Sequence, residues 1–447
     1  MTKLLLKKTT LLCPERIIRS DLLIEESRIS KIAENISAQD AKVLDCRGLL
    51  VLPGIIDEHV HFREPGSPES GTIASESRAA VLGGVTSFMD MPNNNPPAVS
   101  MEAIEHKRAI AARSSLANYA FYLGAAADNL EEIKAADPRI IAGIKIFMGS
   151  STGSLLVEDQ NTLLKIFEAA PALICLHCED SAVISRNYKR AAACYGEKIP
   201  AYLHPYIRSR DACIKSTALA LALAEASGAR IQILHISTAE EVELLKNYLY
   251  GNVKTRQISG EAALPQLYFS ESDYARCGWL LKCNPAVKSE RDRQALVKAL
   301  EDGVLTTFGT DHAPHDPTRK QPPYSRCASG CASIQYTLPA LCALWKRGEL
   351  SLEQLARVSS QNVAERFRIR DRGKIQEGYY ADLAIINPLK PFYVRKEDIQ
   401  MHCGWSPFEN CTFPCSLVHT IVSGKLVVKN GKICAEPGMA LPLEFER

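Results

Sequence analysis

The sequence has no excess of charge of either sign and no long hydrophobic run. Lysine plus arginine number 53 against 51 aspartate plus glutamate, which gives a net charge of +2 over 447 residues. This balance gives no electrostatic reason to expect a nucleic acid or a membrane surface as a partner. No apolar run reaches the ~18–20 residues that span a bilayer, so we expect no transmembrane segment.

The chain also lacks the features of a secretory signal and of a disulfide framework. Its first residues, MTKLLLKK, carry positive charge but no long apolar core and no small-residue cleavage site. The 15 cysteines are scattered, odd in number and set in a chain too long to need cross-links. Two close pairs, Cys175 with Cys178 and Cys327 with Cys331, lack the second CxxC of a zinc ribbon. We therefore expect free thiols and a cytoplasmic location.

The middle of the chain has the pattern of a parallel α/β fold. Between about 53 and 364, apolar strand-like runs alternate with helix-like segments. Eight strands over roughly 300 residues suit a (β/α)8 TIM barrel, which we predict for 53–364. We expect these strands to end near His61, Met91, Leu123, Phe147, His177, His235, Ser259 and Asp311.

Both ends of the chain predict a second, smaller unit. Residues 1–52 and 365–447 contain short strand-like runs separated by turns, including a hairpin about Asn430-Gly431. A chain of this length is too long for one ordinary core. We predict that the two ends meet in one β-sandwich domain beside the barrel.

Two histidines at the end of the first barrel strand form half of a candidate metal site. His59 and His61 follow the apolar run at 49–56. Because side chains in a strand repeat with a period of two, both imidazoles point the same way. Two neutral imidazoles so placed can bind a divalent transition metal. A polar strand end with incidental histidines is the alternative, so the interpretation depends on further ligands.

A lysine inside an apolar strand is the next unusual feature. Lys145 lies in GIKIFM at 143–148, and a buried ammonium is unfavourable unless it is paired or neutralised. Desolvation and nearby cations lower the pKa of such an amine and free it to react. With CO₂ it would form a carbamate whose two oxygens could bridge two metal ions. A lysine that reaches solvent or pairs with an acid is the alternative.

Two more histidines and one aspartate also close apolar strands. His177 follows the run at 172–176, His235 follows the run at 230–234, and Asp311 follows Phe308-Gly309-Thr310. A core histidine with one hydrogen bond, or a helix N-cap for the aspartate, is the alternative at each position. On one barrel rim, however, four histidines, a lysine and an aspartate predict a two-metal hydrolytic site, with Asp311 as general acid and base.

At this point the chain resembles the cyclic-amidohydrolase branch of the amidohydrolase superfamily, and within it the class I dihydroorotases. The resemblance runs nearly end to end. Its motifs are HVHFREPG at 59–66, MPNNNP at 91–96, GIKIFM at 143–148, HCED at 177–180, HIST at 235–238, NPAVK at 284–288 and GTDHAPH at 309–315.

The resemblance implies a TIM barrel, a flanking β-sandwich and two zinc ions. One ion would be held by His59, His61, Lys145 and Asp311, and the other by Lys145, His177 and His235. Hydroxide and an N6-carboxylated Lys145 would bridge them. A homodimer is the family-level expectation, a small molecule is the expected substrate, and association with aspartate transcarbamoylase is compatible with the resemblance.

Substrate choice depends on fewer residues. A guanidinium binds a carboxylate through a bidentate fork, and Arg63 lies two residues beyond His61 on the same face. The resemblance gives Arg63 the ring carboxylate of dihydroorotate, with Asn93 and His315 helping, and gives Asn284 the pyrimidine ring. A surface salt bridge is the alternative for Arg63.

The implied activity is reversible interconversion of N-carbamoyl-L-aspartate and (S)-dihydroorotate, a step of pyrimidine biosynthesis. Hydantoinases and allantoinases share the metal ligands but bind other rings, so they remain a second hypothesis. A third is a catalytically dead scaffold that associates with aspartate transcarbamoylase.

Some positions depart from the common family pattern. Many class I dihydroorotases have aspartate where this chain has Lys145, and threonine where it has Asn94. Ala286 and Lys288 replace a more typical proline and arginine. The segment at 326–333 is expected to belong to a loop that covers the substrate.

Overall fold

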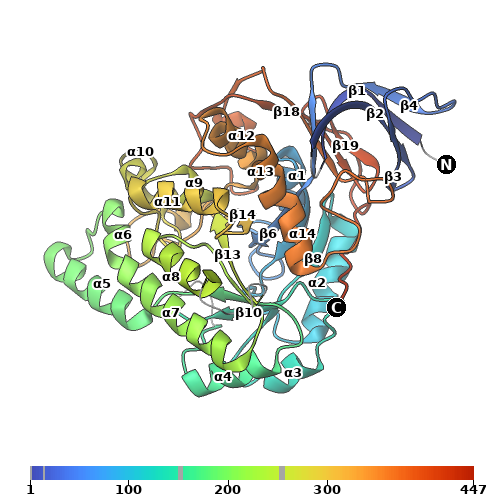
Figure 1. The fold of residues 1–447 in the computed structure, drawn as a ribbon. Helices are drawn as coiled ribbons and strands as arrows, with labels where there is room; N and C mark the ends of the chain where they lie inside the picture. Colours follow the sequence, from blue (N-terminus) through green and yellow to red (C-terminus); the bar gives the residue numbers. More distant parts are fainter. Residues whose placement is uncertain (1–2, 14–15, 150–154, 251–256) are drawn as a thin grey trace.

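Eight parallel strands form a barrel in the computed structural model, which describes residues 3–13, 16–149, 155–250 and 257–447 (Figure 1). The strands β6, β7 and β8 pair in one sheet, and β9 to β14 pair in another, with β8 and β9 continuous along the chain except for Tyr122. A parallel bridge between Val60 and His312 joins the last strand region to the first. The barrel strands are β6 (Ile55–Val60), β7 (Val85–Asp90), β8 (Asn118–Phe121), β9 (Leu123–Gly124), β10 (Ile144–Phe147), β11 (Ile174–His177), β12 (Ile231–Ile233), β13 (Ile258–Ala263) and β14 (Thr307–Gly309).

Helices between the strands surround the barrel (Figure 1). Several begin at a residue whose side chain accepts a hydrogen bond from a backbone N–H of the first turn, as Ser100, Asp159, Asp180 and Ser289 do. No helix among the described residues combines the length and the apolar character needed to cross a bilayer. The α-helices are α1 (Ile73–Leu82), α2 (Met101–Ser114), α3 (Leu130–Ala135), α4 (Gln160–Ala169), α5 (Ser181–Tyr195), α6 (His204–Ile207), α7 (Arg210–Ser227), α8 (Ala239–Tyr250), α9 (Leu264–Tyr268), α10 (Tyr274–Cys277), α11 (Glu290–Glu301), α12 (Thr337–Lys346), α13 (Leu352–Ala356) and α14 (Asn362–Phe367).

The two ends of the chain meet in one nine-stranded sheet beside the barrel. Its strand order is β20-β19-β18-β15-β5-β1-β2-β3, with β4 paired to β1. The predicted fold, a TIM barrel with a flanking β domain built from both termini, is confirmed; the domain boundaries at 52/53 and 364/365 stay a prediction. The strands are β1 (Lys3–Cys13), β2 (Arg16–Glu25), β3 (Arg28–Ala33), β4 (Lys42–Asp45), β5 (Leu50–Pro53), β15 (Leu383–Asn387), β18 (Ser416–Val422), β19 (Lys425–Lys429) and β20 (Lys432–Ile433).

The flanking sheet continues directly into the first barrel strand. Only Gly54 separates β5 from β6. A Cβ at Gly54 would lie 2.2 Å from Thr86 Oγ1 on the neighbouring strand β7, so this junction requires a residue without a side chain. The strand that carries His59 is therefore held on one side by the barrel and at its start by the terminal sheet.

The seventh strand is longer than the sequence pattern indicated. Strand β13 runs to Ala263 instead of ending near Ser259. The apolar run weakens at Ser259-Gly260, which hides the continuation of the strand. As a result, Glu261 lies inside the barrel with no solvent exposure.

A buried ion pair fixes the turns after the first two barrel strands. Lys107 Nζ of α2 lies 2.6 Å from Asp90 Oδ2 at the end of β7, and both side chains are fully buried. The same ammonium donates to Met91 O at 2.9 Å and Asn94 Oδ1 at 2.7 Å. Asp90 Oδ1 accepts from the Phe62 N–H at 2.7 Å. The pair therefore connects the strand ends that border the site.

We expect Lys107→Met to destabilise the fold by about 3–5 kcal/mol, because it leaves the Asp90 carboxylate buried without its cation. The measurement is the urea midpoint of unfolding. The matched control is Lys298→Met, which removes an exposed lysine that pairs with Glu301 and Asp302 and should change stability by at most ~1 kcal/mol. Equal midpoints for the two variants would show that the buried ion pair contributes no more to stability than the exposed one.

Candidate metal centre and substrate pocket

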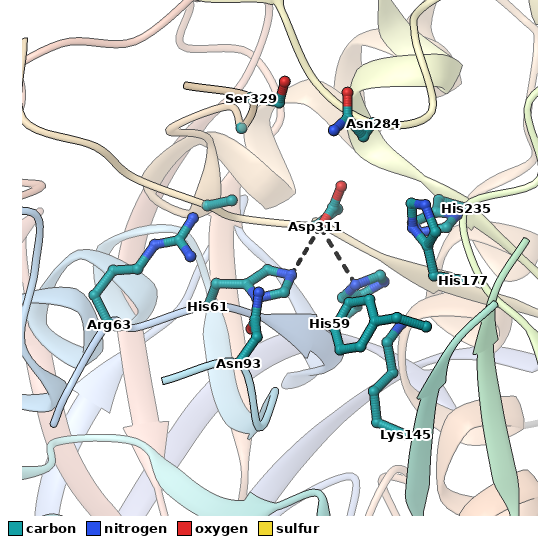
Figure 2. A pocket seen from close by; sticks show the side chains of 13 residues that line it. His59, His61, Arg63, Asn93, Lys145, His177, His235, Asn284, Asp311 and Ser329 are labelled. Atoms are coloured by element: carbon teal, nitrogen blue, oxygen red, sulfur yellow. Dashed lines mark hydrogen bonds and ion pairs between the residues drawn. The ribbon is translucent and has the colours of Figure 1, made fainter. Parts of the chain in front are cut away.

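One pocket at the carboxyl ends of the barrel strands brings together nine of the ten predicted site residues (Figure 2). His315 is the exception, and it contacts the pocket through Arg63. All six predicted metal ligands line the pocket, and so do three of the four predicted substrate residues. The lining consists of His59, His61, Arg63, Asn93, Lys145, Phe147, His177, His235, Asn284, Asp311, Ala313, Ser329 and Gly330.

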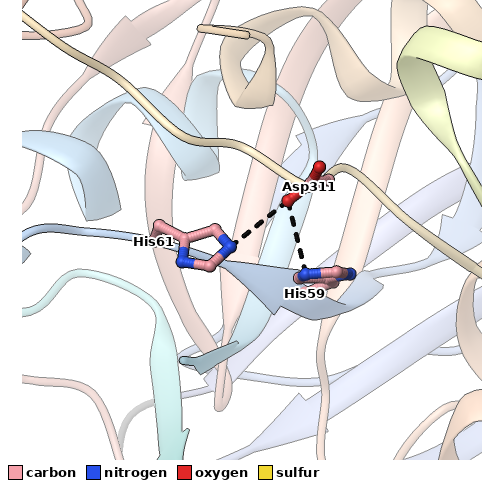
Figure 3. A group of neighbouring side chains, drawn as sticks. All are labelled: His59, His61 and Asp311. Atoms are coloured by element: carbon pink, nitrogen blue, oxygen red, sulfur yellow. Dashed lines mark ion pairs between the residues drawn. The ribbon is translucent and has the colours of Figure 1, made fainter. Parts of the chain in front are cut away.

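The first group of candidate ligands is a compact trio. His59 Nε2 and His61 Nε2 lie 3.3 and 3.2 Å from Asp311 Oδ1 (Figure 3). One possible ligand atom from each residue lies within 4.8 Å of the others, and all three residues are buried. Two imidazoles and a carboxylate at this spacing are a donor set that suits a divalent transition metal.

The second group lies across the pocket on neighbouring strands. His177 Nδ1, at the end of β11, is 2.9 Å from His235 Nε2, just after β12. Lys145 on the adjacent β10 is fully buried, and its Nζ has no hydrogen-bond partner among the described residues. Burial lowers the pKa of this amine to about 8. A buried amine of lowered pKa, with no hydrogen-bond partner among the described residues and on the strand next to that of His177, fits a role as a further metal ligand after carboxylation.

Burial favours the neutral form of three imidazoles of the site. It lowers the pKa of His61 to about 3 and also lowers the pKa of His177 and His235. Desolvation alone would raise the pKa of Asp311, but the neighbouring His59 and His61 hold it below its usual value. Neutral imidazoles and an ionised carboxylate are the protonation states that bind a metal.

Two side chains orient the imidazoles of the trio. His59 Nδ1 lies 3.0 Å from Glu261 Oε1, and His61 Nδ1 lies 2.6 Å from Asn93 Oδ1. Because both oxygens are acceptors, each Nδ1 carries the proton and each Nε2 lone pair faces Asp311. Glu261 Oε1 also accepts from the His235 N–H at 3.0 Å. Glu261 was not among the predicted site residues, and Asn93 was predicted to contact the substrate, not His61.

A buried acid orients His177 in the same way. Glu179 Oε2 lies 3.0 Å from His177 Nε2, which leaves Nδ1 facing His235. Arg208 donates to both carboxylate oxygens of Glu179, at 2.7–3.1 Å. Desolvation alone would raise the pKa of Glu179, but Arg208 and His177 lower it instead. The HCED motif contains Glu179, whereas nothing local in the sequence indicates Arg208.

Three site residues have a strained backbone at the rim. Arg63, His235 and Asp311 have φ values of 67°, 40° and 46°, in the left-handed region that side chains other than glycine rarely adopt. Asp57 helps to hold one of these turns, because its carboxylate accepts from the Thr310 N–H at 2.9 Å and from Thr310 Oγ1 at 2.6 Å. Such backbone strain is concentrated at functional sites in proteins.

Arg63 is a buried cation held by neutral groups. Its Nε donates to Pro314 O at 3.0 Å, and its Nη2 lies 3.1 Å from His315 Nε2. Burial lowers the pKa of the guanidinium to about 10, so it remains charged at neutral pH. Among the described residues, no carboxylate forms an ion pair with it. A buried, unneutralised guanidinium at the pocket wall is suited to bind an anion.

The pocket is also lined by two uncharged polar residues, Asn284 and Ser329. In the view of Figure 2, Asn284 and Ser329 lie above Asp311, and Lys145 lies below it. Asn284 Oδ1 is buried and has no hydrogen-bond partner among the described residues. An unsatisfied amide oxygen is available to accept a hydrogen bond from a ligand N–H.

Comparisons with known proteins agree with this geometry. A model of the amidohydrolase family matches residues 50–427. The chain is 28% identical to an allantoinase of Desulfitobacterium hafniense over 97% of both chains. It is 29% identical to a dihydroorotase of Methanosarcina mazei, over 98% of this chain and 97% of that one. An L-hydantoinase (dihydropyrimidinase) from Arthrobacter aurescens has a matching structure with a TM-score of 0.93 and 26% identity, over 99% of this chain and 100% of that one.

These matches cover the barrel and most of the flanking sheet, including every strand that carries a candidate ligand. They include proteins named for different cyclic substrates, so they identify the family and leave the substrate open. The resemblance inferred from the motifs is confirmed at the level of the family. The chain belongs to the amidohydrolase family.

Proposed function

We propose that the protein is a dihydroorotase, which interconverts N-carbamoyl-L-aspartate and (S)-dihydroorotate. The observation that carries this proposal is Arg63, a buried guanidinium that lines the same pocket as the candidate metal ligands and forms no ion pair with a carboxylate of the described residues. Dihydroorotate has a ring carboxylate that could supply the missing negative charge, whereas hydantoin and allantoin have none. Asn93, Asn284 and His315 would assist in binding the substrate.

Two zinc ions fit the donor atoms of the pocket. His59, His61, Lys145 and Asp311 would hold one, and Lys145, His177 and His235 the other. When bound, such ions would lower the pKa of a water molecule and polarise the amide carbonyl of the ring. For Lys145 to serve as a ligand, its neutral amine would attack CO₂, so that an N–C bond forms as one C=O π bond breaks. Loss of a proton to solvent would then leave a carbamate with two oxygen donors.

Asp311 would move the proton in both directions. During hydrolysis its carboxylate accepts a proton from the attacking water and gives it to the departing ring nitrogen. During ring closure it takes the proton from the ureido nitrogen. Arg63 would fix the ring by its carboxylate, and Asn284 would accept a hydrogen bond from a ring N–H, so that the scissile amide faces Asp311.

A hydantoinase or allantoinase is the second candidate, because relatives with both names match nearly the whole chain. A catalytically dead scaffold that binds aspartate transcarbamoylase is a weaker one, since the pocket retains all six candidate ligands. Fewer than one zinc per chain, after purification with zinc supplied, would favour the scaffold.

We expect the zinc-loaded protein to prefer dihydroorotate to hydantoin and allantoin, and Arg63→Met to remove that preference. Losing the charged fork should raise KM for dihydroorotate by about 10–150-fold, the equivalent of ~1.5–3 kcal/mol. Steady-state kinetics on the three substrates measures both effects. The control is Arg319→Met, a nearby exposed arginine. Unchanged KM in Arg63→Met, or wild-type preference for an uncharged ring, would contradict the proposal.

Asp311→Ala should lower kcat by at least ~100-fold while much of the zinc stays bound, because the proton acceptor is lost and the other ligands remain. Turnover and zinc content by mass spectrometry test this. Asp316→Ala, an aspartate on the same loop outside the pocket, should keep full activity. An active Asp311→Ala enzyme would exclude this residue as the acid and base.

Lys145→Ala should lower the zinc content from two ions towards one and abolish turnover. Short carboxylates such as acetate should restore part of both, because they can replace the two oxygens of the carbamate. Zinc analysis with and without acetate is the measurement, and Lys165→Ala, an exposed lysine on α4, is the control. Two tightly bound zinc ions in Lys145→Ala would show that this lysine is not a bridge.

A further inference from the structure

A loop that borders the substrate pocket is held by buried ammonium groups. We call residues 316–333, which follow the last barrel motif, the covering loop; its Ser329 and Gly330 line the pocket. Gly330 lies so close to Ala313 that a Cβ would be 2.3 Å from Ala313 O. The loop is therefore packed directly against the rim that carries Asp311.

Lys320 fastens this loop to the turn that carries Asn284. Its Nζ donates to Lys282 O at 3.0 Å, Ala328 O at 3.0 Å and Gly330 O at 2.9 Å. Three acceptors use all three donors of an ammonium. The Gly330 N–H also donates to Lys282 O, at 2.8 Å. The two carbonyls on either side of Ser329 are thus tied to a single cation.

Lys282 makes the reciprocal connection. Its Nζ donates to Tyr324 O at 3.0 Å and to Cys327 O, and it lies 4.4 Å from the centre of the Tyr324 ring. Lys282 and Lys320 are both about 95% buried, and neither forms an ion pair with an acid in the described part of the chain. Because a buried ammonium without an acid partner is costly, its hydrogen bonds to the backbone carbonyls of this loop are its main compensation, and they fix the position of the loop.

Ser329 O, the carbonyl between the two that Lys320 binds, takes part in a hydrogen bond at the substrate pocket. His315 Nε2 lies 2.9 Å from Ser329 O and 3.1 Å from Arg63 Nη2. Ser329 O can only accept and Arg63 Nη2 can only donate, so one nitrogen cannot satisfy both. When Nε2 carries a proton and donates it to Ser329 O, the facing N–H of Arg63 has no acceptor at His315.

We propose that Lys320 is a positioning residue that holds Ser329 O against His315, so that the Nη2 donor of Arg63 stays available to an anionic substrate. This inference rests on the proposed function, because it takes the ligand of Arg63 to be the substrate carboxylate. If the hydrogen bonds of Lys320 are lost, Ser329 O moves away from His315. His315 then adopts the tautomer in which Nδ1 carries the proton. Its Nε2 then accepts from Arg63 and competes with the substrate.

Lys320→Met is the variant that tests this inference. In the zinc-loaded protein, KM for dihydroorotate should rise by about 10-fold or more, while kcat changes less than about 3-fold, because Arg63 binds the substrate but does not react. Lys320→Arg should restore KM, since a guanidinium can donate to the same carbonyls. Lys134→Met, which removes an exposed lysine of α3, should leave both constants unchanged.

A second readout does not depend on the substrate. Nitrogen-15 NMR of histidine-labelled, zinc-loaded protein, with His315 assigned through His315→Gln, should show the Nε2-protonated tautomer in the wild type. The Nδ1-protonated tautomer should appear in Lys320→Met and, if that variant does not fold, in Lys320→Gln.

The two readouts separate failure of this inference from failure of the proposed function. A wild-type protein that does not turn over dihydroorotate overturns the proposed function. The NMR measurement then still tests whether Lys320 sets the tautomer of His315. An unchanged His315 tautomer, an unchanged KM, or a loss in kcat alone in Lys320→Met would overturn the inference.

Discussion

The crowding of ionisable groups into a buried barrel end is the constraint on which the rest of the structure depends. Imidazoles, carboxylates and one amine lie together there with little solvent exposure, and burial influences which of them carry charge. It lowers the pKa values of His61 and Lys145. A buried polar group is unfavourable unless it has a hydrogen-bond partner. Glu261 and Glu179 supply such partners for His59 and His177, and in doing so they fix which nitrogen of each ring faces the pocket.

Strands and turns of the barrel position different groups of the site. The strands carry Lys145, His177 and His59 on a rigid frame, where register alone sets their separation. The turns carry Arg63 and Asp311, and their unusual backbone conformations aim side chains that a regular strand could not. Orienting groups come from distant parts of the chain, so the geometry of each ring depends on the closure of the whole barrel.

Much of this could be predicted from sequence because it depends on local pattern. Period-two spacing placed His59 and His61 on one face, and apolar runs located most strand ends. Glu261 was missed because Ser259-Gly260 looked like the end of a strand. The contact of Asn93 with His61 and the pairing of Arg208 with Glu179 could not be foreseen, since they join residues about 30 positions apart and depend on which side of a rim each turn takes. The domain boundaries stay predictions.

The single-residue junction at Gly54 makes the small sheet more than an attachment. Strand β5 pairs with β1 from the beginning of the chain and β15 from its end, and then enters the barrel as the histidine-bearing strand. Removing β1 or β15 would leave one edge of β5 unpaired. The strand that carries His59 would then be less well held. The smallest piece of this protein able to assemble the pocket is therefore nearly the entire polypeptide, and attempts to isolate the barrel as a free-standing catalyst should begin by replacing those two edge partners.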